Sequence, residues 1–323
     1  VAATEHRIAE AVDRTVANNW GGTGSYIKQG AGVLTISGTM STTGSLDLQA
    51  GTVKLAARER CSSSLDLTVN TGAIFDLNAF TETLGLVVLS GGSIINSTGD
   101  STQYLASTSY DVRSGTISAR LGGTAALVKS TADTVTLSGA NTFTGGSTVQ
   151  AGTLDLAGSL GSGITVDGGV LSLGSTTGIR TVSGNVTLNS VGTLRIRLNG
   201  TTAGTQHDQL RVTNSTSTIT LGGTLDLIAT SGLAVGSTFR IVETTGTSAA
   251  VSGTFAGLPQ NAEFYQDGQR WRIIYTGGTG NDVTLTRIAP TAWQTWQASN
   301  FGPNTNIAAI SGDLADYYTD DVS

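Results

Sequence analysis

"TVTLSGANTFTGGSTVQAGTLDL", residues 134–156, decides the fold class of this 323-residue chain. Apolar and polar residues alternate at both ends of the stretch, in "TVTL" (134–137) and in "GTLDL" (152–156). Alternation over a few residues is typical of a β-strand that buries one face. The glycines between these units mark turns, because glycine adopts backbone conformations that other residues avoid. The stretch therefore predicts short strands joined by turns.

The same pattern occurs a second time. Residues 26–55 align without gaps to residues 127–156, and twelve of the thirty aligned positions are identical. Lys28 aligns with Lys129, and Gly51 with Gly152. Shorter units of a glycine followed by alternating residues recur elsewhere, among them "GAIFDL" (72–77), "GVLSL" (169–173), "GTLRI" (192–196) and "GTLDL" (223–227). Internal repetition of this kind indicates a solenoid.

A strand of five residues spans about 16 Å and cannot bury its apolar face alone. Stacked rungs about 4.8 Å apart form a continuous core of Leu, Val and Ile instead. We therefore expect an all-β chain whose body is a parallel β-solenoid, with a β-sandwich as the competing architecture. The expected segments are an N-terminal cap (1–22), the solenoid (23–230), a C-terminal antiparallel β cap of hairpins (231–288) and an aromatic, Asp-rich tail (289–323).

Composition excludes several classes of protein. Only 12% of the residues are charged, against about 25% in ordinary domains. The net charge is −6 and no Lys/Arg cluster occurs, so we expect no nucleic-acid partner. No apolar run reaches the ~18 residues of a membrane helix, so we expect no membrane span. Cys61 is the only cysteine, which excludes an intrachain disulfide.

The repeat at 134–156 resembles the autotransporter-associated β-strand repeat, also called the passenger-associated transport repeat. Phe143 stands where that family usually has tyrosine, and Ser147 where it has threonine. The first copy departs further at Thr39 and Met40. The resemblance extends over roughly residues 13–288 and implies a right-handed β-helix in a secreted or surface-displayed bacterial passenger. It implies little about activity, since the family is defined by a scaffold.

"GGTGND" (277–282) matches the start of the nonapeptide that binds calcium in β-rolls. Those sites lie between consecutive turns and need tandem copies, whereas this chain has one copy. Apolar residues alternate on both sides of the motif, which favours a glycine turn in a hairpin. Asp282 remains a weak metal candidate, and calcium is the one cofactor for which the sequence offers any sign.

No residue set predicts catalysis. His207 and Asp208 are adjacent, and neighbours in a strand face opposite sides, so we expect His207 to serve in packing or at the surface. Lys28 and Lys129 are expected to face turns and to cover apolar surface with their stems. Acidic residues recur inside the strand units and are expected to face outward into solvent: Asp47, Asp66, Asp76, Asp155 and Asp226.

The two ends differ from the middle. Ile8, Val12 and Val16 are spaced as in a short amphipathic helix, although a first strand also fits. The tail contains aromatic residues of the kind common at protein contacts. The candidate contact residues are Trp293, Trp296, Phe301, Tyr317 and Tyr318.

These features favour a secreted, non-enzymatic structural protein, extracellular or at the cell surface, whose copies associate into a homo-oligomer or filament. One alternative is a β-helical polysaccharide lyase, which requires acidic side chains and a Lys or Arg that converge in a groove. The other is an adhesin that binds glycans.

Overall fold

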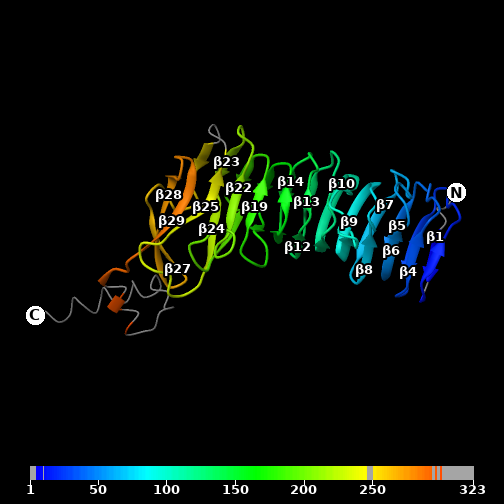
Figure 1. Ribbon diagram of the computed structural model, residues 1–323, viewed down its shortest axis with the longest axis horizontal. Helices are drawn as coiled ribbons and strands as arrows, with labels where there is room; N and C mark the ends of the chain where they lie inside the picture. Colours follow the sequence, from blue (N-terminus) through cyan, green and yellow to red (C-terminus); the bar gives the residue numbers. More distant parts are fainter. Residues whose placement is uncertain (1–4, 10, 246–249, 293–294, 297–298, 300–323) are drawn as a thin grey trace, which may run out of the picture.

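The computed structural model describes residues 5–9, 11–245, 250–292, 295–296 and 299. Its body is an elongated β-solenoid with the N-terminus at one end and antiparallel strands at the other (Figure 1). The strands of successive turns pair in parallel, as the repeated short units predict. This confirms the parallel solenoid over the sandwich.

Three parallel ladders run along the solenoid. The first is formed by β1 (Glu5–Ala9), β3 (Ser25–Gln29), β5 (Ser45–Leu48), β7 (Asp66–Asn70), β9 (Glu82–Ile95), β10 (Leu105–Ile117), β11 (Leu127–Lys129), β14 (Ser147–Val149), β17 (Ile164–Val166), β20 (Val186–Leu188), β23 (Thr218–Leu221) and β26 (Ala250–Gly253). The second is formed by β2 (Arg14–Val16), β4 (Val33–Ile36), β6 (Gly51–Leu55), β8 (Ala73–Asp76), the long strands β9 and β10, β12 (Thr134–Leu137), β15 (Thr153–Leu156), β18 (Val170–Ser172), β21 (Thr193–Leu198) and β24 (Thr224–Ala229).

The third ladder begins as single bridges at Trp20, Met40 and Cys61. It continues in β13 (Ala140–Asn141), β16 (Ser159–Leu160), β19 (Ile179–Val182), β22 (Gln209–Val212) and β25 (Thr238–Thr244). The antiparallel strands β29 (Asp282–Ile288), β28 (Gln269–Gly277) and β27 (Glu263–Gln266) then extend it. This is the antiparallel C-terminal cap that the sequence predicts.

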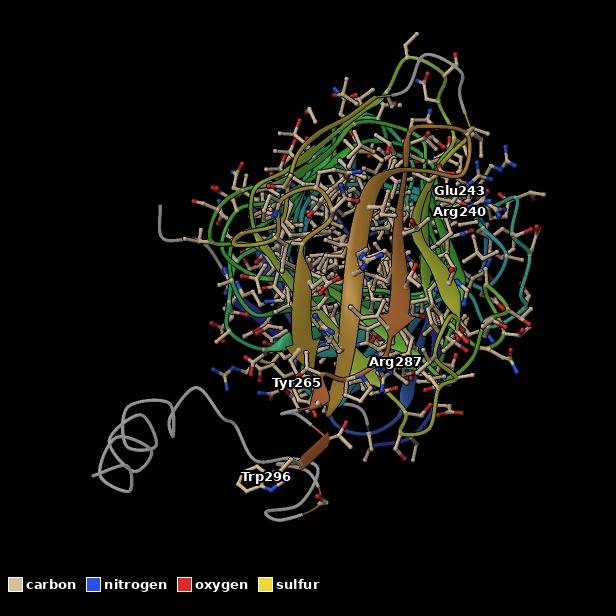
Figure 2. All side chains as sticks on the ribbon, turned by 90° about the vertical axis from the view of Figure 1, so that its left-hand side faces the viewer. Arg240, Glu243, Tyr265, Arg287 and Trp296 are labelled. Carbon is tan, nitrogen blue, oxygen red and sulfur yellow. The ribbon has the colours of Figure 1, made fainter. Side chains whose placement is uncertain are left out.

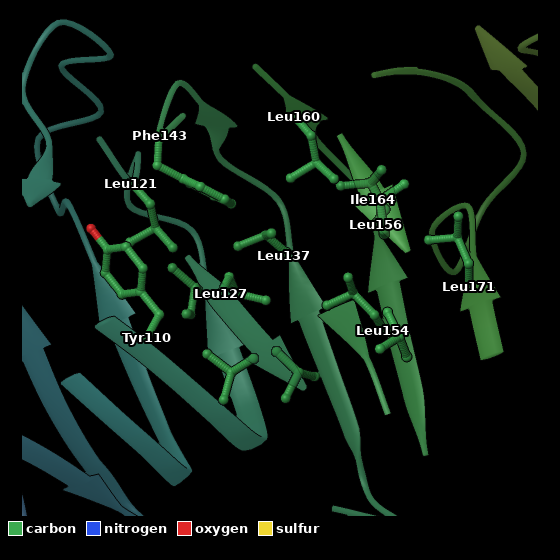
Figure 3. Packing of buried hydrophobic residues seen from close by; sticks show 14 of the residues in the cluster. Tyr110, Leu121, Leu127, Leu137, Phe143, Leu154, Leu156, Leu160, Ile164 and Leu171 are labelled. Carbon is green, nitrogen blue, oxygen red and sulfur yellow. The ribbon is translucent and has the colours of Figure 1, made fainter. Parts of the chain in front are cut away.

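The core is a column of aliphatic side chains inside the three ladders. Leu137 on β12 and Leu154 and Leu156 on β15 are fully buried, and they pack beside Tyr110 and Phe143 (Figure 3). The apolar positions of each short unit thus face inward, because successive side chains of a strand point to opposite faces. Each buried Leu or Val stabilises the fold by about 1.5–3 kcal/mol relative to exposure.

The N-terminal segment forms strands, not a helix. β1 pairs with β3 and β2 pairs with β4, so the segment is the first rung of the solenoid. Ile8 and Val16 are partly buried against the core, whereas Val12 lies between the two strands with 69% of its surface exposed. The helical spacing fails because pairing with the next rung satisfies the backbone of both strands.

Candidate functional site

The outer face of the third ladder carries a groove near the C-terminal cap. Its floor is made by β22, β25 and β29, which lie side by side: Arg211 on β22 is opposite Glu243 on β25, and Arg240 is opposite Thr284 on β29. The loop that contains Thr201 and Ala203 forms one wall, and the hairpin turn at Gly278 forms another. Two adjoining hollows share Arg240 and Glu243 and hold about 410 and 430 Å³. These volumes are in the usual range of small-molecule sites.

A β-bulge places two of the charged side chains on the same face. The register of β25 against β29 shifts between Arg240 and Val242. In a regular strand, residues three apart face opposite sides. The extra residue turns the chain, so Arg240 and Glu243 both face the groove and their side chains bond at 2.7 Å (Figure 2). Bulges are common next to functional sites because they redirect side chains in this way.

The groove contains a chain of alternating charges. Oε2 of Glu243 accepts a hydrogen bond from Nε of Arg211, and Oε1 accepts from Nη1 of Arg240. Nε of Arg240 lies 3.4 Å from Oδ2 of Asp282. The arginine side chains are 34% and 41% exposed, whereas Glu243 is 17% and Asp282 is 1% exposed. The accessible charge in the groove is therefore mainly cationic.

His207 forms part of the groove wall and is almost completely buried. Its ring packs edge-on against Phe239, with centroids 5.5 Å apart, and Nδ1 lies 3.1 Å from the Gly200 carbonyl oxygen. Burial lowers the pKa of His207, and the carbonyls of Gly200 and Arg240 partly offset that effect. The packing role expected from the sequence is confirmed.

Asp208 points away from His207 and has different partners. Its carboxylate accepts from the backbone N–H of Gly178 at 3.0 Å and of Arg197 at 2.9 Å, and from the Arg197 guanidinium at 3.2 Å. Burial raises the pKa of Asp208, and these donors oppose the rise. Asp208 thus joins two loops to β21, and the pair forms no dyad.

The turn with the β-roll-like motif is a hairpin. β28 and β29 are antiparallel, and Gly277 is paired with Asp282. The buried Asp282 carboxylate accepts from the Thr244 backbone N–H at 3.0 Å and faces Arg240. A Cβ at Gly278 would clash with Oδ2 of Asp282, which accounts for glycine there. In the described part of the chain, no three His, Cys, Asp or Glu side chains are placed to hold one metal ion.

The prediction for the strand aspartates is wrong at two positions. Asp66 is exposed, and Asp47 and Asp226 are partly exposed, but Asp76 and Asp155 are buried. Oδ1 of Asp76 accepts from the N–H groups of Asn78 and Ser97, and Oδ1 of Asp155 accepts from the N–H of Gly174. Both carboxylates leave the core side of their strands as expected, but neighbouring turns fold over them.

Lys28 and Lys129 are also more buried than predicted. Both are strand residues, in β3 and β11, whose Nζ atoms reach carbonyls of the following turns as expected, but neither side chain reaches solvent. Nζ of Lys28 donates to the carbonyls of Gln29, Gly30 and Ala50 at 3.0, 2.7 and 3.3 Å, which joins two successive turns. Nζ of Lys129 donates to the Thr131 carbonyl. Burial lowers the pKa of Lys129, which the charges of Asp133 and Asp111 oppose.

Glu82 is a buried carboxylate that the sequence offered no reason to select. It accepts from the backbone N–H groups of Arg60 at 2.8 Å, Cys61 at 3.2 Å and Thr83 at 3.2 Å. Burial raises the pKa of Glu82 to about 7 despite these donors. Cys61 is buried beside it, and burial raises the pKa of its thiol.

Of the aromatic tail residues, only Trp296 lies among the described residues, and its surface is 44% exposed. Figure 2 shows it beyond the cap, outside the solenoid body. The other four contact candidates, Trp293, Phe301, Tyr317 and Tyr318, lie outside the described residues.

Sequence reasoning also missed Arg211, Arg240 and Glu243. Each stands next to apolar residues within its strand, in "QLRV" (209–212) or "TFRIVET" (238–244). A charge inside an otherwise apolar strand is the signal that could have selected them. Their proximity could not be found that way, because it depends on rung length and on the bulge.

The comparisons with known proteins support the scaffold and leave the groove unassigned. None of the curated proteins compared with the chain matches it. No helix in the described part is long and apolar enough to cross a membrane. The family model described as passenger-associated-transport-repeat matches residues 27–55 and 127–156, the two copies aligned above. The chain therefore carries two passenger-associated transport repeats within its β-solenoid.

Proposed function

We propose that the chain is the structural, non-enzymatic solenoid of a secreted or surface-displayed bacterial protein, and that its copies associate end to end into an extracellular fibre or matrix. The passenger repeats and the parallel solenoid support export and display. Association and the absence of an enzymatic role are the parts of the proposal that need a test.

The observation that carries the proposal is the open edge of the first rung, which contrasts with the covered edge of β24 at the other end. β1 pairs with β3 and, among the described residues, with no other strand. Ile8, Val16 and Trp20 pack against the core on one side and remain partly exposed on the other. A strand edge of this kind pairs readily with another chain. We take this first rung as one contact surface.

At the opposite end the cap covers β24, whereas β26 pairs with β23 alone among the described residues. The Gln266 and Gln269 side chains donate to the carbonyls of Leu227 at 3.3 Å and Thr230 at 2.9 Å, and Asp267 accepts from the Ala229 N–H at 2.8 Å. These bonds lie at the end of β24 and on the residue after it, so a second copy that stacked on β24 would have to displace them. The tail (289–323) follows this cap in the sequence, and we propose it as the contact that reaches the first rung of the next copy.

Two matched variants test the assembly. Val12 in the first rung and Val191 in the body are 69% and 67% exposed, so lysine at either position costs little stability. Val12→Lys should reduce sedimenting oligomers in analytical ultracentrifugation, and Val191→Lys should not. Equal assembly of the two variants would rule out the first rung as the contact.

The contacts of the groove carboxylates support the non-enzymatic part of the proposal. Glu243 accepts hydrogen bonds from two arginines, and Asp282 accepts one from the Thr244 N–H and forms an ion pair with Arg240. A calcium-assisted lyase uses carboxylates to bind cations and a base to abstract a proton. Incubation with uronate polymers and calcium should give no unsaturated product; its appearance would establish the lyase alternative instead.

A further inference from the structure

We propose that the groove over β22, β25 and β29 binds an acidic sugar, a uronate unit of an extracellular polysaccharide. This inference adds a ligand to the proposed scaffold, and it holds whether or not the copies assemble. It rests on the greater exposure of the arginines than of the carboxylates, on the bulge that brings Arg240 beside Glu243, and on the chemistry of the other lining residues.

The arginines can donate hydrogen bonds to a ligand carboxylate without losing their present bonds. Arg211 uses Nε for Glu243 and Nη2 for Gln209, and Arg240 uses Nη1 for Glu243 and Nε toward Asp282. A guanidinium has five N–H donors, so each side chain has donors to spare. Because Glu243 fixes both guanidiniums at neighbouring positions, they present a preorganised pair. Arg–carboxylate pairs of this type are strong and directional.

Glu243 and Asp282 balance the charges of the two arginines, but Glu243 is about half as exposed as Arg211, and Asp282 is almost fully buried. A ligand in the groove therefore meets cationic groups first, although the whole chain has a net charge of −6. The exposed guanidiniums attract an anionic ligand group, and the less exposed carboxylates repel it only weakly. A neutral ligand could accept hydrogen bonds from this pair but would lack the charge that strengthens an Arg–carboxylate bond.

The rest of the lining is suited to hydroxyl groups. Thr201, Thr238 and Thr284 line one hollow together with Gln209, and Thr279 lines the other. Hydroxyls and amides both donate and accept hydrogen bonds, which matches the hydroxyl groups of a sugar ring. Among the described lining residues there is no Trp, Tyr or Phe on which a neutral sugar could stack. Recognition through the carboxylate is therefore the mode that this groove offers.

The test is calorimetric titration of the full chain with a short oligogalacturonate, and with a neutral oligosaccharide of equal length. Arg211→Gln and Arg240→Gln should each weaken binding of the acidic oligomer about tenfold, because a charged hydrogen bond is lost. Arg195→Gln is the matched control, since Arg195 makes a similar pair with Asp226 at 2.7 Å on another ladder. Binding to this control should equal that of the unaltered chain.

Glu243→Gln provides a test in the opposite direction. It removes the competing negative charge but keeps one carbonyl oxygen that can accept from an arginine, so the acidic oligomer should bind more tightly while thermal unfolding reports an intact fold. The inference is overturned if the unaltered chain does not bind the acidic oligomer, if the arginine variants bind it equally well, if the neutral oligomer binds as tightly, or if an acidic peptide does. None of these results affects the sedimentation of the Val12 and Val191 variants, so the two proposals fail separately.

Discussion

Arg211 on β22 and Glu243 on β25 face each other across adjacent rungs, and the Arg211 guanidinium donates to the Glu243 carboxylate. The pair joins β22 to β25 on the face that forms the groove. Both side chains remain partly exposed, so screening limits the free energy of the pair to about 1 kcal/mol or less.

A double-mutant cycle on Arg211 and Glu243 should give a coupling free energy of about 0.5–1 kcal/mol in chemical denaturation. The pair Arg195–Asp226, which has the same parallel cross-rung geometry, should give a similar value. A coupling near zero for the first pair alone would show that Glu243 does not hold Arg211 in place.

Lys28→Met and Lys129→Met should each destabilise the fold by about 1–3 kcal/mol, because partly buried carbonyls lose their donor. Lys54, the third lysine of the chain, is the control: it is partly exposed and 3.9 Å from Asp76. Lys54→Met should cost less than about 1 kcal/mol. Equal losses for all three variants in urea titration would contradict the turn-joining role of the buried lysines.

Stability should depend on pH through Glu82. Its pKa rises from 4.5 to about 7 on folding, so between these values the folded state binds more protons than the unfolded state. The free energy of unfolding therefore falls as the pH rises from about 4.5 to 7. In Glu82→Gln this fall should shrink by on the order of 3 kcal/mol. Glu5→Gln, at a largely exposed position, should keep the slope of the unaltered chain, and an unchanged slope in Glu82→Gln would refute the assignment.

Gly278→Ala should destabilise the cap by on the order of 1–3 kcal/mol beyond the cost of its positive φ, because the new Cβ displaces Asp282. Gly257 has a similar φ of 71° with nothing nearby, and Gly257→Ala reports the backbone cost alone.

Chelation with EDTA should leave the melting temperature of the unaltered chain unchanged. A drop on chelation would return Asp282 to consideration as a calcium ligand.

Deletion of residues 289–323 should leave a folded β protein that no longer assembles. Circular dichroism should retain the β signal, since the cap ends with β29 at Ile288. Normal assembly of the truncated chain in electron micrographs would show that the aromatic tail is not the assembly contact.

The sequence predicts the strands well and the surface poorly. Units such as "GTLDL" (152–156) become β15 with Leu154 and Leu156 inside, because alternation alone decides which face is buried. Alternation also places Asp155 outside, but it carries no information about the turn that brings the Gly174 N–H onto it.

The groove could not be predicted from the alternation of apolar and polar residues. Arg211 and Glu243 meet because one rung of the solenoid, longer than those near the N-terminus, separates them. Arg240 and Glu243 face the same side because of a bulge, which breaks the period that sequence reasoning assumes. Rung length and bulges follow from the packing of whole turns, so no local pattern gives them.

Electron microscopy of the unaltered full chain tests the central claim most directly. End-to-end association predicts filaments or linear oligomers whose length exceeds that of one solenoid and grows with protein concentration. Single rods of one solenoid length at every concentration would contradict it.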